Sequence, residues 1–104
     1  MVIYEVNLAI NEEVYTQFKL WLKKHAIEML QFPGFIQANI LKPEKEEMSG
    51  KEKLTVQYQL KNRKALEVYF EKFAPIMRQE GINLFKDKFS AERRIYEVQE
   101  MIIK

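Results

Sequence analysis

Apolar and polar residues alternate at the start of the chain. From residue 2 to residue 10 the even positions are apolar, and this period of two predicts a strand with one buried face. Residues 54–60 repeat the pattern, and residues 35–41 and 89 to about 98 are predicted as two further strands. The buried faces of the first and third strands would consist of Val2, Tyr4, Val6, Leu8, Ile10, Leu54, Val56, Tyr58 and Leu60.

Between the first two strands the apolar spacing changes to three or four residues, which is typical of an amphipathic helix. This helix is predicted to begin at Asn11, whose side chain is expected to cap it, and to run to about Leu30 before Pro33–Gly34. Its apolar stripe includes the only histidine of the chain and consists of Val14, Phe18, Trp21, Leu22, His25 and Met29. We therefore expect a titratable ring among aromatic side chains.

A second helix is predicted after the third strand. Asn62 is expected to cap it, Pro75 predicts a kink or a restart near Ala74, and Gly81 is expected to end it. Its apolar stripe consists of Leu66, Tyr69, Phe70, Phe73 and Met77. The polar segment 42–53 is expected to be a mobile hairpin connection, and residues 99–104 either extend the last strand or fray.

The order strand, helix, strand, strand, helix, strand most simply folds as a four-stranded antiparallel sheet with both helices on one face. This is the ferredoxin-like α+β arrangement, and 104 residues leave room for a single domain. The second face of the sheet would carry a mixed set of side chains, namely Ile3, Glu5, Asn7, Ala9, Thr55, Gln57 and Gln59. That face is either solvated or covered by a second copy in a homodimer that closes a barrel, and we favour the homodimer.

Composition argues against several classes of function. Seventeen basic and 15 acidic residues leave a net charge of +2, too small to indicate a nucleic-acid partner. One histidine, one aspartate and no cysteine disfavour a bound metal, and three isolated glycines build no phosphate loop, so no cofactor is predicted. The chain shows neither a membrane-spanning apolar segment nor a secretory signal, and the default expectation is a cytoplasmic protein without a membrane partner.

A cleft between helices and sheet is the remaining candidate site. Its lining would be Tyr4, Trp21, His25, Tyr58 and Tyr69, together with Arg78, Arg93 or Arg94. The simplest interpretation is that the aromatics are core residues and that His25 is a structural histidine with satisfied nitrogens. The functional interpretation is that an arginine anchors a substrate carboxylate. Because Arg93 and Arg94 have opposite strand parity, one would face the helices and the other the open face of the sheet.

Short segments along the chain match one family. They are Tyr4–Asn7, Trp21 with His25, Phe32–Phe35, Gln57–Tyr58, Tyr69 with Ala74–Pro75, Met77–Arg78, and Phe89 with Arg93–Arg94. On these segments the sequence resembles, over nearly its whole length, a small bacterial family known only as a domain of unknown function. The resemblance implies the dimeric α+β barrel superfamily, which includes antibiotic-biosynthesis monooxygenase-like and EthD-like proteins.

The leading hypothesis is a homodimeric small-molecule-binding or scaffold protein. Its ligand, a small aromatic molecule or a carboxylate, would contact Tyr4, Trp21, Tyr58, Tyr69, Arg78 and Arg94. The alternative is a cofactor-independent enzyme, monooxygenase-like or isomerase-like, in which His25 is the general base and Tyr58 or Arg94 stabilises developing negative charge. A third hypothesis is a purely structural dimer with neither a cavity nor an open imidazole.

Overall fold

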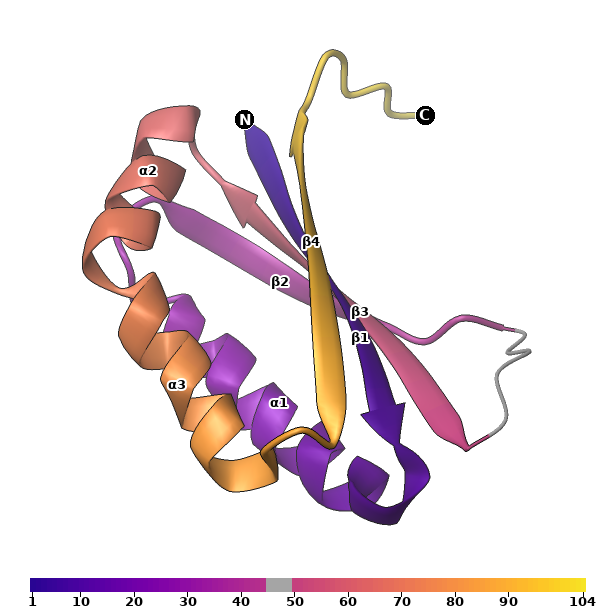
Figure 1. Ribbon diagram of the computed structural model, residues 1–104. Helices are drawn as coiled ribbons and strands as arrows, with labels where there is room; N and C mark the ends of the chain where they lie inside the picture. Colours follow the sequence, from indigo (N-terminus) through magenta and orange to yellow (C-terminus); the bar gives the residue numbers. More distant parts are fainter. Residues whose placement is uncertain (45–49) are drawn as a thin grey trace.

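The computed structural model describes residues 1–44 and 50–104. In chain order its elements are strand β1 (Val2–Asn11), the 3₁₀ helix η1 (Glu12–Val14), α1 (Tyr15–Met29), β2 (Phe35–Leu41), β3 (Lys51–Leu60), α2 (Arg63–Lys72), α3 (Ala74–Phe85) and β4 (Phe89–Glu97). The strands form one antiparallel sheet of order β2-β3-β1-β4, and the α-helices cover one of its faces (Figure 1). The predicted ferredoxin-like α+β fold is confirmed.

The core lies between the two central strands and the helices. Tyr4 is opposite Tyr58 and Leu8 is opposite Leu54, so the apolar even positions of β1 and β3 share the helix-covered face. All the predicted core positions on these two strands are buried except Val6, which is partly buried against the cluster. Phe18, Leu22 and Met29 of α1 and Leu66 and Tyr69 of α2 complete the core from the other side.

The first helix begins later than the sequence predicts. Asn11 makes no side-chain cap, because β1 continues through it: Asn11 pairs with Lys51 and its backbone N–H donates to the Lys88 carbonyl at 2.9 Å. The chain then forms the short η1 turn before α1. At the other end Pro33–Gly34 follows the helix as predicted. Gly34 has φ +84°, and a Cβ there would lie 2.4 Å from the Ala65 Cβ, so the turn requires glycine.

The second helical region is divided in two, with the restart where Pro75 predicts it. The Asn62 side chain accepts a hydrogen bond from the Ala65 backbone N–H at 2.9 Å and caps α2, as predicted. Pro75 lies in the first turn of α3, where a missing N–H removes no helical hydrogen bond. The prediction that Gly81 ends the helix is wrong. Gly81 is buried inside α3, where a Cβ would lie only 2.9 Å from the Trp21 ring.

The connection predicted over residues 42–53 is shorter than expected, because β3 already begins at Lys51. Residues 45–49 of this connection, and with them its predicted mobility, lie outside the described residues. At the end of the chain, the Val98 backbone N–H still donates to the Met1 carbonyl at 2.9 Å, and residues 99–104 leave the sheet instead of extending β4 (Figure 1). The tail exposes Ile102 and Ile103, at 87% and 79% respectively.

Candidate functional site

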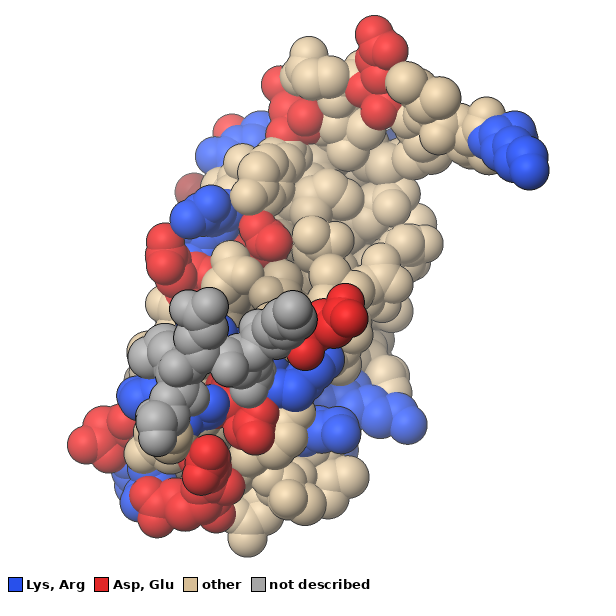
Figure 2. All heavy atoms as spheres, turned by 90° about the vertical axis from the view of Figure 1, so that its right-hand side faces the viewer, with Lys and Arg blue, Asp and Glu red and all other residues tan. Residues whose placement is uncertain are grey.

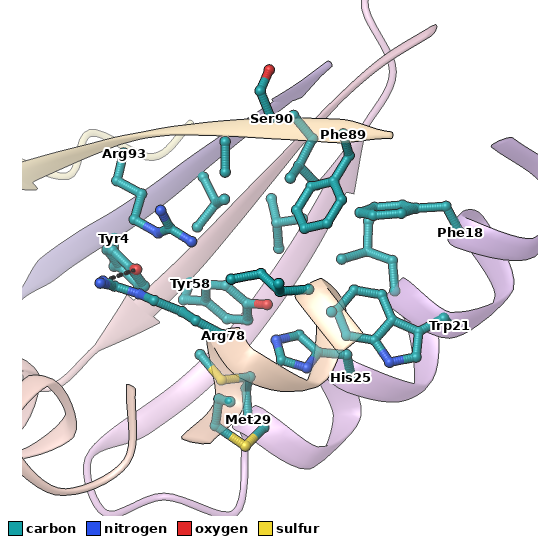
Figure 3. A pocket seen from close by; sticks show the side chains of 18 of the residues that line it. Tyr4, Phe18, Trp21, His25, Met29, Tyr58, Arg78, Phe89, Ser90 and Arg93 are labelled. Atoms are coloured by element: carbon teal, nitrogen blue, oxygen red, sulfur yellow. Dashed lines mark hydrogen bonds between the residues drawn. The ribbon is translucent and has the colours of Figure 1, made fainter. Parts of the chain in front are cut away.

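A cavity of about 280 Å³ lies between the sheet and helices α1 and α3 (Figure 3). Strands β1, β3 and β4 supply one side of its wall, and α1 and α3, with Tyr69 of α2, supply the other. Its aromatic lining consists of Tyr4, Phe18, Trp21, His25, Tyr58, Tyr69 and Phe89. An apolar wall with a few polar groups is typical of small-molecule sites, and this volume suits a small ligand.

All the predicted site residues except Arg94 line this cavity. Arg94 lies opposite Glu5 on the open face of the sheet, and its guanidinium is 3.6 Å from the Glu92 carboxylate. Arg93, opposite Val6, faces the helices and lines the cavity instead. The prediction that Arg94 binds or stabilises charge in the same pocket as His25 is therefore wrong.

Strand parity was the signal that could have assigned the two arginines. Phe89, Ala91 and Ile95 have the same parity as Arg93 and are apolar, so Arg93 continues the helix-covered face. Phe89 also lines the cavity, although the sequence pattern predicts only that a strand begins there. In Figure 3 Phe89 points into the cavity, whereas its neighbour Ser90 points away.

His25 is half-buried and stacks on Trp21, with ring centroids 4.6 Å apart and an interplanar angle of 27°. Its Nδ1 is buried and has no hydrogen-bond partner among the described residues. Burial lowers the pKa of His25, while the nearby carboxylates of Glu80 and Glu28 act in the opposite direction. The ring is therefore neutral near pH 7, and the interpretation of His25 as a fully satisfied structural histidine does not hold for Nδ1.

Trp21 is held in place on both sides. Its indole N–H donates to Glu80 Oε1 at 3.2 Å, which also keeps the Glu80 carboxylate near His25. Its ring meets Phe18 in an edge-to-face arrangement with centroids 5.4 Å apart. Gly81 provides the space that the indole occupies against α3. The end of the cavity near α1 is thus an aromatic wall in which Trp21 contacts Phe18 and His25 directly, so a shift of the indole would move both neighbours.

Three tyrosines form the opposite part of the wall. The ring of Tyr4 lies 6.0 Å from those of both Tyr58 and Tyr69, and its hydroxyl accepts a hydrogen bond from Arg78 at 3.2 Å. Burial is the main cause that raises the pKa values of Tyr58 and Tyr69, against a smaller lowering effect of Arg93. Both hydroxyls therefore stay protonated at physiological pH and can donate hydrogen bonds.

The charged residues that line the cavity are all basic. They are Arg78, Lys86 and Arg93, and neither Asp nor Glu is part of the wall formed by the described residues. Within residues 1–44 and 50–104, no three His, Cys, Asp or Glu side chains are grouped to hold a metal ion. No helix in the described part of the chain is long and apolar enough to cross a membrane.

One family model matches residues 1–99, nearly the whole chain, and describes a domain of unknown function, DUF4286. The chain belongs to this family. The resemblance inferred from the sequence is thereby confirmed. No curated protein matches the chain.

Solved structures with the same fold come from several bacteria. A proposed antibiotic biosynthesis monooxygenase from Deinococcus radiodurans has 20% sequence identity and a TM-score of 0.75, with 100% of this chain and 98% of that one covered. One from Nitrosomonas europaea has 15% identity, a TM-score of 0.72 and coverage of 96% and 100%. SnoaB, a cofactor-independent oxygenase from Streptomyces nogalater, has 10% identity, a TM-score of 0.72 and coverage of 99% and 98%. At these sequence identities, the similarity of the structures shows that the fold is shared and shows nothing about activity.

Proposed function

We propose that this protein binds a small aromatic molecule in the cavity between the sheet and helices α1 and α3. The observation that carries the proposal is the cavity of about 280 Å³ with a wall of aromatic rings. Ring faces and edges favour a second aromatic at offset-stacked or edge-to-face geometry, which adds to the gain from burying its surface. The protonated Tyr58 and Tyr69 hydroxyls and the neutral His25 ring supply polar contacts that orient the ligand.

The proposal is tested with 2-naphthamide, an uncharged aromatic probe. Trp21 is the only tryptophan, so the single indole N–H signal in a ¹H–¹⁵N spectrum reports on the cavity wall. We expect this signal to shift with saturation as the probe is added. In Ala91→Leu, which fills the cavity from β4, we expect binding to weaken about tenfold or more, because side-chain volume replaces ligand volume.

The matched control is Ala9→Leu, which makes the same change on the open face of the sheet, where Ala9 lies opposite Ser90. It should bind the probe as the unmodified protein does. An indole signal that does not move up to the solubility limit of 2-naphthamide would refute the proposal.

A second candidate function is a cofactor-independent enzyme with His25 as its general base. The neutral state of the ring, which lines the cavity, favours it, because a general base needs an unprotonated nitrogen. The neighbouring Tyr58 hydroxyl would donate a hydrogen bond to the oxyanion of the substrate. SnoaB, a protein of the same fold, is described as a cofactor-independent oxygenase, so oxygen is the co-substrate to test first.

The enzymatic candidate is tested by oxygen uptake with electron-rich phenols and naphthols. We expect His25→Gln to reduce the rate by roughly 10²–10⁴-fold, the range for loss of a general base, while 2-naphthamide binding persists. Equal rates for the two proteins would remove His25 from the chemistry. Binding without uptake would leave the small-molecule-binding function alone.

We propose further that two copies associate through the open face of the sheet. Figure 2 views the molecule from this side, and a continuous area of uncharged residues lies in the middle and upper right of the view, bordered by acidic residues above and basic residues below. Polar groups at the centre are already paired within the face: Thr55 donates to Asn7 at 2.8 Å, and Gln57 donates to Glu5 at 3.4 Å. Such pairing lowers the cost of burying polar side chains against a second copy.

A further inference from the structure

We propose that the ligand of this cavity is an aryl carboxylate whose anionic group is held by Arg93 together with Arg78. This inference rests on the proposed function, binding of a small aromatic molecule in the same cavity. It adds the charge of the ligand, its orientation and the residue that anchors it.

The first argument is the sign of the charge around the cavity. Arg78, Lys86 and Arg93 line it, and the described residues contribute no Asp or Glu to its wall. Two carboxylates act on His25 at the aromatic end, Glu80 and Glu28, but neither lines the cavity, and Glu80 is engaged by the Trp21 indole at 3.2 Å. A partly enclosed site bordered by cations alone attracts an anion, and the low polarity of its wall strengthens that attraction.

Arg93 lies on the helix-facing side of β4 at an exposed position. It interrupts the apolar helix-facing positions of β4 and lies opposite Val6. No carboxylate in the described part of the chain forms an ion pair with it. By contrast, Arg94 next to it pairs with Glu92, and Lys88 reaches Glu13 at 2.8 Å. Arg93 is exposed at the border of the cavity, and without an acidic partner its planar group of donors is open to a ligand.

Arg78 lines the same cavity as Arg93 and is held at the Tyr4 hydroxyl. Its guanidinium donates to the Tyr4 hydroxyl at 3.2 Å and lies over the Phe70 ring at 5.7 Å. In Figure 3, Arg93 from β4 and Arg78 from α3 both extend toward Tyr4. Both guanidinium groups act electrostatically on Tyr69, and a carboxylate bound between them would accept hydrogen bonds from both.

The arrangement of the remaining wall orients the ligand. With its carboxylate at Arg93 and Arg78, the aromatic body extends along the cavity toward Trp21 and His25. The charge of Arg93 also acts on Tyr58 and Tyr69, whose pKa values it lowers against the larger effect of burial. The Tyr58 hydroxyl points toward His25 (Figure 3), so it is available to a polar group on the aromatic body of the ligand.

The test compares 2-naphthoate with 2-naphthamide, which have the same ring and differ in charge. Both are titrated into the unmodified protein, Arg93→Gln and Arg94→Gln at low salt, with affinities from the Trp21 indole signal and from calorimetry. We expect the unmodified protein to bind 2-naphthoate about tenfold or more tightly than 2-naphthamide, the factor typical of hydrogen bonds to a charged group. Arg93→Gln should lose this preference while still binding the amide.

Arg94→Gln is the matched control, because it removes the same charge one residue away on the opposite face of the sheet. It should keep the preference for 2-naphthoate. Arg93→Lys retains a charge without the planar donor group, and we expect it to restore part of the preference. Dispersed amide signals in each variant establish that it is folded.

The outcomes separate this inference from the function on which it rests. Amide binding with no preference for 2-naphthoate, or a preference that survives Arg93→Gln, would overturn the anionic anchor and leave the aromatic site in place. Equal loss in Arg93→Gln and Arg94→Gln would show a general charge effect and would also overturn it. Absence of binding by either probe to the unmodified protein would refute the proposed function and, with it, the inference.

Discussion

At the scale of single residues, His25 stands out because its environment in the folded protein does not favour an imidazole. Its Nδ1 is buried without a hydrogen-bond partner among the described residues, a situation that costs about 1–3 kcal/mol. Its ring still packs on Trp21 with centroids 4.6 Å apart. A phenyl ring at this position could make the same packing, but it would lack the titratable nitrogens of the imidazole.

The lowered pKa of His25 predicts a specific dependence of stability on pH. Because the folded pKa lies below the ordinary value of 6.5, protons bind more readily to the unfolded chain. Stability that is present above pH 6.5 is therefore lost as the pH falls toward and through the folded pKa. His25→Phe has no such titrating group. As the pH falls from 7 to 5, the free energy of unfolding of His25→Phe should therefore increase relative to that of the unmodified protein.

Urea unfolding at several pH values measures the difference between the two proteins. Groups other than His25 are present in both, and most of their titration cancels in the comparison. Parallel pH profiles would contradict the lowered pKa. A large loss of stability in His25→Phe at pH 7 would instead assign His25 a structural role.

At the scale of secondary-structure elements, the packing of α1 against α3 depends on Gly81. A glycine inside a helix costs about 1 kcal/mol relative to alanine, so a reason outside the helix is required. The Trp21 ring supplies it, since a Cβ on Gly81 would lie 2.9 Å from the indole. The same ring is part of the cavity wall and stacks on His25.

Gly81→Ala is therefore expected to lower the stability by roughly 1–3 kcal/mol, because overpacking outweighs the gain in helix propensity. It should also shift the indole N–H signal of Trp21, whose hydrogen bond to Glu80 depends on the ring position. Asn83→Ala is the control, an exposed position in the same helix. A Gly81→Ala protein more stable than the unmodified one, with an unmoved indole signal, would contradict this account.

At the scale of the whole molecule, the helices cover only one face of the sheet, and the other face needs either water or a partner. We expect sedimentation equilibrium at micromolar concentration to give twice the chain mass of 12.5 kDa. Ile3→Lys places a charge on the open face, where Ile3 lies opposite Gln59 and Tyr96, and should shift the protein to the monomer.

Ile27→Lys serves as the control for that experiment. Ile27 is 58% exposed on α1, and α1 lies against the helix-covered face of the sheet (Figure 1). The variant should keep the mass of the unmodified protein. A single-chain mass for the unmodified protein at high concentration would exclude the dimer, and dissociation of Ile27→Lys alone would move the interface to the helices.

Local patterns in the sequence were sufficient for the elements and their order. Alternation identified the buried faces of β1 and β3, and Pro33–Gly34 and Pro75 marked the helix boundaries, because these signals act within a few residues along the chain. The same patterns predicted most residues of the cavity wall, because the inward-facing residues of the strands and helices all lie in the space between the sheet and the helices. They failed at Asn11 and Gly81, where a distant partner overrides the local preference of the residue.

The sequence by itself determined the α+β order, the core faces and the family of this protein. The tertiary structure decided which side chains meet: Tyr4 with Tyr58, and Trp21 with Glu80 and Gly81. It also placed the His25 ring in the cavity wall with its Nδ1 buried and without a partner among the described residues. It also decided that Arg93 and not Arg94 borders that cavity. The physical reason is that periodicity states which face a residue occupies, whereas register and packing between distant segments determine its neighbours, its burial and its charge environment.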